Sequence, residues 1–379
     1  GAINANGGFS ITGNASLANN ITTSNKTLQI GGTLTIDQNA DVNLTTGGGA
    51  LTVSGATTGT TGGGDESLTI SAGAGTVNLA AIYGSGTAAD ATGLNNVTIT
   101  SSSVTNFNGA IAISVALVMN ATTGTTTFNS TVNVGSADLT NTNFVFNAEV
   151  TATGTFKLNA SGSITIGTNV TFTAATADFT SGTGITQQSG SKVLATTLKL
   201  RGAGSVTLTN SANDITNLDA VLSGTGSLSY RDATSVDVAA IVTASTVNIT
   251  VGAAITDSGA ISGTTLTMSS VTGTILDFGH NISAFNGTNT TSGNIQLVNT
   301  GSLDITGISQ SGGNLILNNT GAITSSGAVL VSGTTSLTAG ANDITLAVTT
   351  NNFGTVVITS GNNVTLVDSN GFNLGVSTV

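Results

Sequence analysis

Short runs in which apolar and polar residues alternate recur along the chain, and clusters of Gly, Asn and Ser separate them. Three examples are Asn314–Leu317 (NLIL), Asp343–Leu346 (DITL) and Val356–Thr359 (VVIT). Alternation with a period of two places every second side chain on one face, which is the pattern of a β-strand with one buried face. Gly, Asn and Ser favour turns. The pattern therefore predicts short strands joined by tight turns.

The apolar positions of these runs recur at intervals of about 20 residues. They form three columns: Ile295, Leu315, Leu337 and Val357; Leu303, Ile323, Ile344 and Val364; Ile308, Val329 and Phe372. Longer echoes accompany them, because Ala254–Ile261 (AITDSGAI) returns as Ala322–Val329 (AITSSGAV). One block of about 20 residues thus predicts one coil of two or three short strands.

A single coil of this kind cannot bury its inward side chains, so coils must stack in parallel and pair each strand with its equivalents in the coils above and below. The sequence therefore predicts an all-β parallel β-solenoid that forms one domain over residues 1–379. About 18 coils at the usual strand spacing would give an elongated rod of roughly 85 Å. Three stretches break the period and are expected to be loop excursions, near residues 45–66, 83–94 and 277–292.

Composition agrees with a stacked β-structure. The 379 residues include 51 Gly and no Pro, and a strand inside a parallel stack cannot use Pro because Pro has no N–H for the ladder. Only 6% of residues are charged and 4% aromatic, which argues against a helical protein. The chain has no Cys, so it can form neither a disulfide nor a thiolate metal site.

The formal net charge is −11, from 17 acidic and 6 basic residues. All six cations lie in the first two-thirds of the chain: Lys26, Lys157, Lys192, Lys199, Arg201 and Arg231. Nucleic acids and anionic membranes attract clustered Lys and Arg, so we expect neither as a partner. The longest apolar run, Ile111–Met119, is far shorter than the roughly 20 residues of a membrane helix, so no membrane insertion is expected.

Candidate catalytic chemistry is sparse. His280 is the only histidine, with Asp277 and Asn281 nearby, and no nucleophile accompanies it at a recognised spacing. We expect His280 to be a surface-loop residue without a catalytic role. β-Helix enzymes that act on polysaccharides use clustered carboxylates, basic residues and aromatic platforms, and this chain has few of the last two. We therefore assign no catalytic, cofactor-binding or metal-binding residue.

Calcium is the alternative cofactor, because Ca²⁺ is bound by carboxylates and turn carbonyls. Residues 62–66 (GGGDE) resemble one calcium-binding repeat, and Asp37 with Asp41 and Asp214 with Asp219 are isolated acidic pairs. Solvated turn carboxylates are the preferred interpretation. Pairs of Thr around one apolar residue, such as Thr207–Thr209 and Thr265–Thr267, have irregular mutual spacings, so we expect no single face to collect them.

Several blocks resemble repeats of large bacterial adhesins of the filamentous haemagglutinin type. They are Gly321–Ala328, Leu337–Leu346 and Asn352–Ser369, and the similarity is clearest from about Ser205 onward. The resemblance implies a right-handed parallel β-helix, an extracellular location at the cell surface, and a role in adhesion or surface structure.

These observations together predict a non-enzymatic extracellular rod, either an adhesin stalk or a subunit of a cell-surface filament. Its expected partners are itself, end to end, or neighbouring segments of a longer adhesin, together with host or cell-surface glycans. A carbohydrate-active β-helix enzyme and a calcium-dependent binding module are the alternatives.

Overall fold

The computed structural model describes residues 1–60, 66–85, 93–121, 123–243 and 245–379. Within these ranges every regular element is a β-strand. The described residues contain no helix that could span a membrane. The described strands form a parallel β-solenoid of about 18 turns with roughly 20 residues per coil. The predicted fold class is therefore confirmed.

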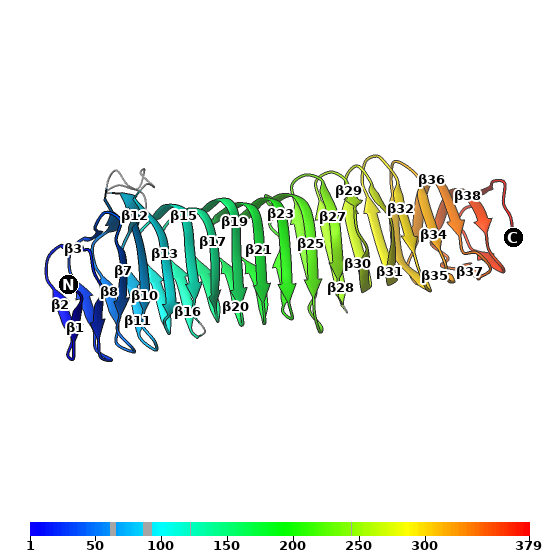
Figure 1. Cartoon of the computed structure of the whole chain (residues 1–379). Coiled ribbons are helices and arrows are strands. Elements are labelled where there is room, and N and C mark those ends of the chain that lie inside the picture. Colours follow the sequence, from blue (N-terminus) through cyan, green and yellow to red (C-terminus); the bar gives the residue numbers. More distant parts are fainter. Residues whose placement is uncertain (61–65, 86–92, 122, 244) are drawn as a thin grey trace. The chain divides into compact units, whose positions relative to one another are not determined.

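The chain divides into two compact units, Gly1–Thr196 and Thr197–Val379. Figure 1 shows that in each unit the strands of successive coils lie side by side. The strands of the first unit are β1 (Ile3–Ala5), β2 (Phe9–Ile11), β3 (Ala15–Leu17), β4 (Ile21–Thr23), β5 (Leu28–Ile30), β6 (Leu34–Ile36), β7 (Asp41–Thr45), β8 (Leu51–Val53), β9 (Thr57–Gly59), β10 (Glu66–Ser71), β11 (Thr76–Leu79), β12 (Ile82–Ser85), β13 (Leu94–Ser101), β14 (Val104–Phe107), β15 (Ile111–Asn120), β16 (Thr125–Phe128), β17 (Val132–Asn141), β18 (Asn143–Phe146), β19 (Val150–Ala160), β20 (Ser163–Ile166), β21 (Thr171–Ser181) and β22 (Gly184–Gln187).

β23 (Lys192–Gly202) runs through the boundary between the units. The strands of the second unit are β24 (Ser205–Leu208), β25 (Asp214–Leu222), β26 (Leu228–Asp232), β27 (Val236–Val242), β28 (Thr246–Val251), β29 (Ile255–Asp257), β30 (Ile261–Ser270), β31 (Thr274–Asn289), β32 (Ile295–Asn299), β33 (Leu303–Gln310), β34 (Leu315–Asn319), β35 (Ile323–Ser325), β36 (Val329–Thr338), β37 (Ile344–Leu346), β38 (Asn352–Ser360), β39 (Val364–Leu366) and β40 (Asn373–Leu374).

The register of the second unit tests the predicted apolar columns. The second column is confirmed, because Leu303, Ile323, Ile344 and Val364 are successive parallel partners. Ile308 and Val329 are also partners, as the third column required.

Three members of the predicted columns are wrong: Leu337, Val357 and Phe372. Leu315 pairs with Thr335, whereas Leu337 is the partner of Leu317. Val357 pairs with Ser336 on the outward side, and Ile358 is the partner of Leu337. Phe372 does not extend the third column. Its ring instead packs edge-on against the ring of Phe353, with centroids 5.9 Å apart.

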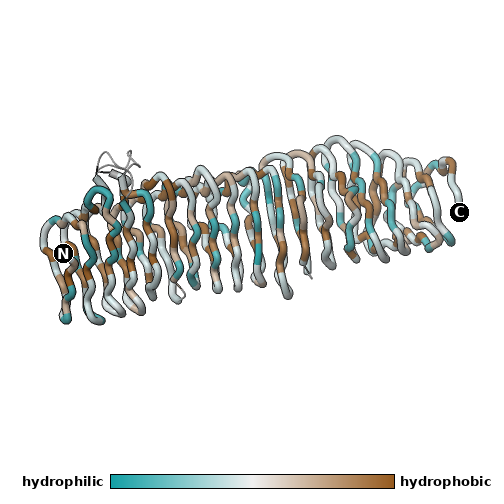
Figure 2. The backbone as a smooth tube through the Cα atoms, viewed as in Figure 1, coloured by the Kyte–Doolittle hydropathy of each residue, from teal (hydrophilic) through white to brown (hydrophobic). Residues whose placement is uncertain are grey.

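The core consists of the inward side chains of each coil, which stack on their equivalents in neighbouring coils. Figure 2 shows hydrophobic segments recurring from coil to coil between hydrophilic ones. In the first unit, the rings of Phe107, Phe128 and Phe146 stack with centroids 4.8 Å apart and interplanar angles of 9° and 1°. This separation matches the distance between hydrogen-bonded strands, so parallel register brings the rings directly into contact.

Two of the expected loop excursions lie partly outside the described residues. Within the stretch 45–66, the strands β8 and β9 continue the coil, and residues 61–65 are not described. Within 83–94, β12 extends to Ser85 and β13 begins at Leu94, while residues 86–92 are not described. The predicted loop at residues 45–66 is therefore wrong for the part that contains β8 and β9.

The expected excursion at residues 277–292 is also wrong over most of its length, because β31 runs from Thr274 to Asn289. The extra residues form a bulge, seen as a register shift between Leu276, which pairs with Leu297, and His280, which pairs with Asn299. Bulges absorb inserted residues without ending a strand. The excursion was expected because the interval from Leu266 to Ile295 is longer than one coil, but these two residues belong to different columns, and Leu266 pairs with Phe285.

Candidate functional site

His280 is not in a surface loop, as the sequence had suggested, but is buried within β31. Its side chain has 0% exposure, and that of Asp257, its neighbour on β29, has 1%. Nδ1 accepts a hydrogen bond from the backbone N–H of Ile261 at 2.9 Å. Nε2 lies 3.1 Å from Asp257 Oδ2, at ion-pair distance but without hydrogen-bond geometry. Because Nδ1 is an acceptor, the neutral ring carries its proton on Nε2.

The carboxylate of Asp257 holds the bulge in place. Its two oxygens accept the backbone N–H groups of Asp277 and Phe278, each at 3.0 Å. Burial lowers the pKa of His280 below its ordinary value, against the opposing influence of the Asp257 and Asp277 carboxylates. Asn281 is exposed and pairs with Ser262. The group His280, Asp257 and Ile261 therefore joins neighbouring coils inside the wall, where solvent does not reach.

The acidic pairs found in the sequence bind to neighbouring coils instead of to each other. Asp37 accepts a hydrogen bond from the Ser16 hydroxyl, and Asp41 accepts one from the Ser67 hydroxyl. In both cases the donor belongs to another coil. Of the GGGDE segment only Glu66 is described. It is buried, and its Oε1 accepts the Thr60 hydroxyl at 2.5 Å.

Asp214 and Asp219 also have different partners. Asp214 accepts the Thr234 hydroxyl at 2.9 Å. The Asp219 carboxylate forms an ion pair with Arg201 Nη2, while Arg201 Nη1 donates to the Asp219 carbonyl at 2.8 Å. In the part of the chain that the structure describes, no three His, Cys, Asp or Glu side chains come together as a metal site would require.

One outward column of the second unit contains one cation, four hydroxyl residues, one Leu and one Asn, and we call it the outward ladder. Its seven residues come from β26, β28, β30, β31, β33, β36 and β38. In register order they are Arg231, Thr250, Ser269, Thr288, Ser309, Leu330 and Asn352. Six steps at the strand spacing of a sheet give the ladder a length of about 29 Å.

The four hydroxyls of the outward ladder form no hydrogen bond within the described chain: Thr250, Ser269, Thr288 and Ser309. Many other outward hydroxyls do, since Ser258 donates to Asp237 at 2.5 Å and Ser326 donates to Asp304 at 2.6 Å. The ladder therefore presents a row of donors and acceptors that the protein itself does not use.

Arg231 begins this ladder as an exposed cation. No carboxylate of the described residues lies within ion-pair distance of its guanidinium. The adjacent Asp232 points inward, where its Oδ2 accepts the Tyr230 hydroxyl at 2.6 Å and the Ile215 N–H at 3.0 Å. Burial is the largest cause of a raised pKa at Tyr230, and also at Asp232, where these hydrogen bonds oppose it. The carboxylate of Asp232, the acid next to Arg231 in the sequence, is thus hydrogen-bonded to Tyr230 and Ile215 and not to Arg231.

A groove of about 300 Å³ adjoins Arg231. The residues that line it come from the corner that follows the ladder strands: Ser211, Arg231, Asp232, Ala233, Thr250, Val251, Gly252, Ser269, Ser270, Val271 and Thr290. The groove therefore combines one unpaired cation, hydroxyls, small apolar residues and the buried Asp232, whose carboxylate already accepts hydrogen bonds from Tyr230 and Ile215.

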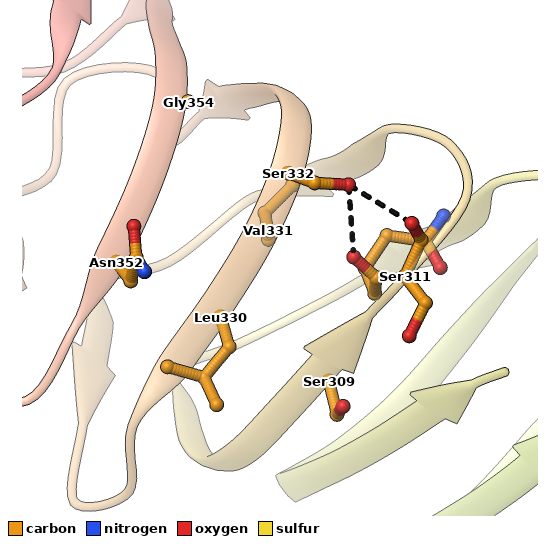
Figure 3. A pocket seen from close by; sticks show the side chains of 8 residues that line it. Ser309, Ser311, Leu330, Val331, Ser332, Asn352 and Gly354 are labelled. Carbon is orange, nitrogen blue, oxygen red and sulfur yellow. Dashed lines mark hydrogen bonds between the residues drawn. The ribbon is translucent and has the colours of Figure 1, made fainter.

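A second groove, of about 350 Å³, lies at the other end of the ladder and contains no charged residue. Figure 3 shows Ser309, Leu330 and Asn352 on neighbouring strands of this groove. Leu330 is 42% exposed. The Ser332 hydroxyl donates to the Ser311 carbonyl at 3.0 Å and fixes the adjoining corner.

Sequence reasoning named Arg231 only as one of six cations and did not find the ladder. It also expected no single face to collect the Thr pairs, and the register aligns only one Thr from each of two pairs. Thr207 and Thr267 share one outward column through Ser229 and Asn248. These positions are aligned by the pairing register of the strands, which cannot be read from the sequence alone.

Two segments of the chain, residues 167–221 and 292–360, match the model of DUF5649, a family described as repeats of unknown function. The chain is thus similar to a repeat-protein family. The matched segments together cover less than half of the chain, and they include strands from β21 to β25 and from β32 to β38. No curated protein and no solved structure matches the chain significantly. The similarity to DUF5649 agrees with a solenoid of repeated coils.

Proposed function

We propose that this chain is a non-enzymatic, extracellular structural and adhesive segment at the cell surface, either the stalk of an adhesin or a subunit of a surface filament. The observation that supports this most is the uninterrupted parallel pairing of coils within each unit. Each coil adds backbone hydrogen bonds and buried apolar side chains to its neighbours, so the stack resists bending and local opening. The repeats that resemble filamentous haemagglutinin-type adhesins support the same role.

Three observations support a passive role. The only histidine is enclosed in the wall with Asp257. The carboxylates of four acids bind side chains of neighbouring coils: Asp37, Asp41, Asp214 and Asp219. Neither groove is lined by a histidine, and Asp232, the carboxylate beside Arg231, already accepts hydrogen bonds from Tyr230 and Ile215. These observations favour a surface that binds ligands without catalysing a reaction.

The same geometry supports assembly through the stacking of coils. The edge of a parallel coil offers unpaired N–H and C=O groups, and another coil satisfies them by extending the sheet. We therefore expect the partners to be a second copy of this chain or a neighbouring segment of a longer adhesin. Electron micrographs of the purified chain distinguish the two: indefinite fibres favour a filament subunit, and single short particles favour a stalk segment.

Immunogold labelling of intact producing cells tests the location. Label on the outside of unpermeabilised cells is expected, and label only after permeabilisation would overturn the proposal. Incubation with a panel of acidic polysaccharides tests the absence of enzymatic activity. No shortened or unsaturated product is expected, and its appearance would favour a carbohydrate-active enzyme.

A further inference from the structure

We propose that the groove beside Arg231 is a binding site for a sugar that carries a carboxylate, and that the outward ladder extends this site over neutral sugar units. This inference rests on the proposed adhesive function and names the class of ligand. Three features of the groove carry it: the guanidinium of Arg231, which no described carboxylate pairs, the hydroxyls of Ser211, Thr250 and Ser269, which have no partner in the described chain, and an apolar surface. Asp232 also lines the groove, but its carboxylate is buried and accepts hydrogen bonds from Tyr230, Ile215 and Thr234.

The guanidinium provides the charge recognition. Arg presents planar donors that match the two oxygens of a carboxylate, and such charge-assisted pairs are stronger than neutral hydrogen bonds. Arg201 shows what occurs when a protein carboxylate is within reach, because it is bound to Asp219 by both side-chain and backbone contacts. Arg231 lacks such a partner, so its guanidinium remains available to a ligand.

The hydroxyls and small apolar residues fit the remainder of a sugar. Thr250 is the register partner of Arg231 in the next coil, and Ser269 is the partner of Thr250 in the coil after that. The hydroxyls of both residues can donate hydrogen bonds to sugar hydroxyls and accept hydrogen bonds from them. Ala233 and Val271 provide apolar contact for the C–H face of a ring. Burying such a ring satisfies its polar edge and its apolar face together.

The protein's charge limits the ligand to few carboxylates. With a net charge of −11, the chain repels a polyanion, whereas one carboxylate paired with Arg231 adds little repulsion. Beyond Thr288 the ladder has no charged residue, and it ends at the exposed Leu330 and Asn352. A neutral oligosaccharide that ends in one acidic sugar matches this order of side chains.

Isothermal titration calorimetry with the full chain tests the proposal. The probes are 3′-sialyllactose and a glucuronic acid-terminated disaccharide, each compared with its neutral counterpart. We expect both acidic sugars to bind more tightly than the neutral ones, and Arg231→Ala to weaken their binding about tenfold or more. Lys199→Ala is the matched control, because it removes the same charge from the second unit at a residue that lines neither groove. It should leave the affinity unchanged.

Thr250→Val tests the hydroxyls separately. It removes one hydroxyl at nearly constant volume and should weaken binding several-fold, whereas Thr324→Val, at an outward hydroxyl beside Asp304, should not. Equal affinity for acidic and neutral sugars, or equal effects of Arg231→Ala and Lys199→Ala, would overturn the site. Circular dichroism of each variant checks folding. Cell-surface labelling tests the location of the protein, and the titrations test the binding site. A wrong location and a wrong site therefore give different results.

Discussion

The buried histidine makes the stability of the second unit depend on pH in a predictable direction. Protonation of His280 would place a proton on Nδ1, which now accepts the Ile261 N–H, and two donors would then face each other. Asp257 and Asp277 favour the charged ring, but burial outweighs them and the pKa of His280 is lowered. Lowering the pH from 7.5 to 5 is therefore expected to favour unfolding.

The size of the effect follows from proton linkage. In the unfolded chain the imidazole has an ordinary pKa of about 6.5. Between this value and the lower folded pKa, only the unfolded state binds the proton, so the free energy of unfolding decreases as pH falls. The decrease is at most about 1.4 kcal/mol per pH unit, which gives an upper limit of about 2 kcal/mol at pH 5. Above pH 6.5 the stabilisation is fully present.

Nuclear magnetic resonance measures this directly, because the chain contains one histidine and therefore one set of imidazole signals. In the folded protein, the ring should titrate at a lower pH than in urea, where it should titrate near its ordinary pKa, and its neutral form should carry the proton on Nε2. The free energy of unfolding, followed by circular dichroism, should fall with pH more steeply in the native protein than in His280→Asn. A folded ring that titrates at or above pH 6.5, or parallel pH profiles for the two proteins, would refute the reasoning.

Three further perturbations test the stacked coils. Phe128→Ala removes the middle ring of the aromatic stack and should lower the free energy of unfolding by about 4 kcal/mol. Phe278→Ala, at a side chain that is 61% exposed, should change it by less than about 0.5 kcal/mol in the same urea titration, and equal losses would contradict the stacked core. Gly124→Ala would place a Cβ atom 1.3 Å from the Ser103 carbonyl oxygen at a φ of +92°, so it should cost about 3 kcal/mol or more, and a wild-type melting temperature would show that the turn is built differently. A chelator should shift the melting temperature by less than about 1 °C, and a larger fall that added calcium reverses would favour the calcium-dependent alternative.

The stacked fold could be predicted from the sequence because each coil repeats the same burial requirement. Leu303, Ile323 and Ile344 recur at nearly constant spacing, and only parallel stacking buries them all. Where apolar residues are adjacent, it was harder to assign which of them point into the core. Val356, Val357 and Ile358 are all suitable core residues, and the sequence alone does not show that the middle one points outward.

The ladder could not be predicted because the coil length varies. Arg231 and its partner Thr250 are 19 residues apart, whereas Leu330 and its partner Asn352 are 22 apart. Turns and bulges absorb the difference without disturbing the pairing, so counting residues does not recover outward neighbours.

His280 was misplaced for a related reason. The polar sequence around it, from Asp277 to Asn281, has the composition of a loop, yet Asp257 on the preceding coil accepts its backbone N–H groups and keeps it in the wall. A contact between coils thus overrode a local preference.

The pairing of Leu303 with Ile323 also has a consequence for how such a chain changes its length in evolution. Removing residues 303–322 would bring Ile323 into the place of Leu303 and leave every later strand in register, because each coil contacts only its immediate neighbours. A deletion of one residue inside a strand would instead turn its buried side chains outward. Gene rearrangements in whole-coil steps are therefore tolerated where single-codon deletions are not, and the number of coils can change without redesigning the core.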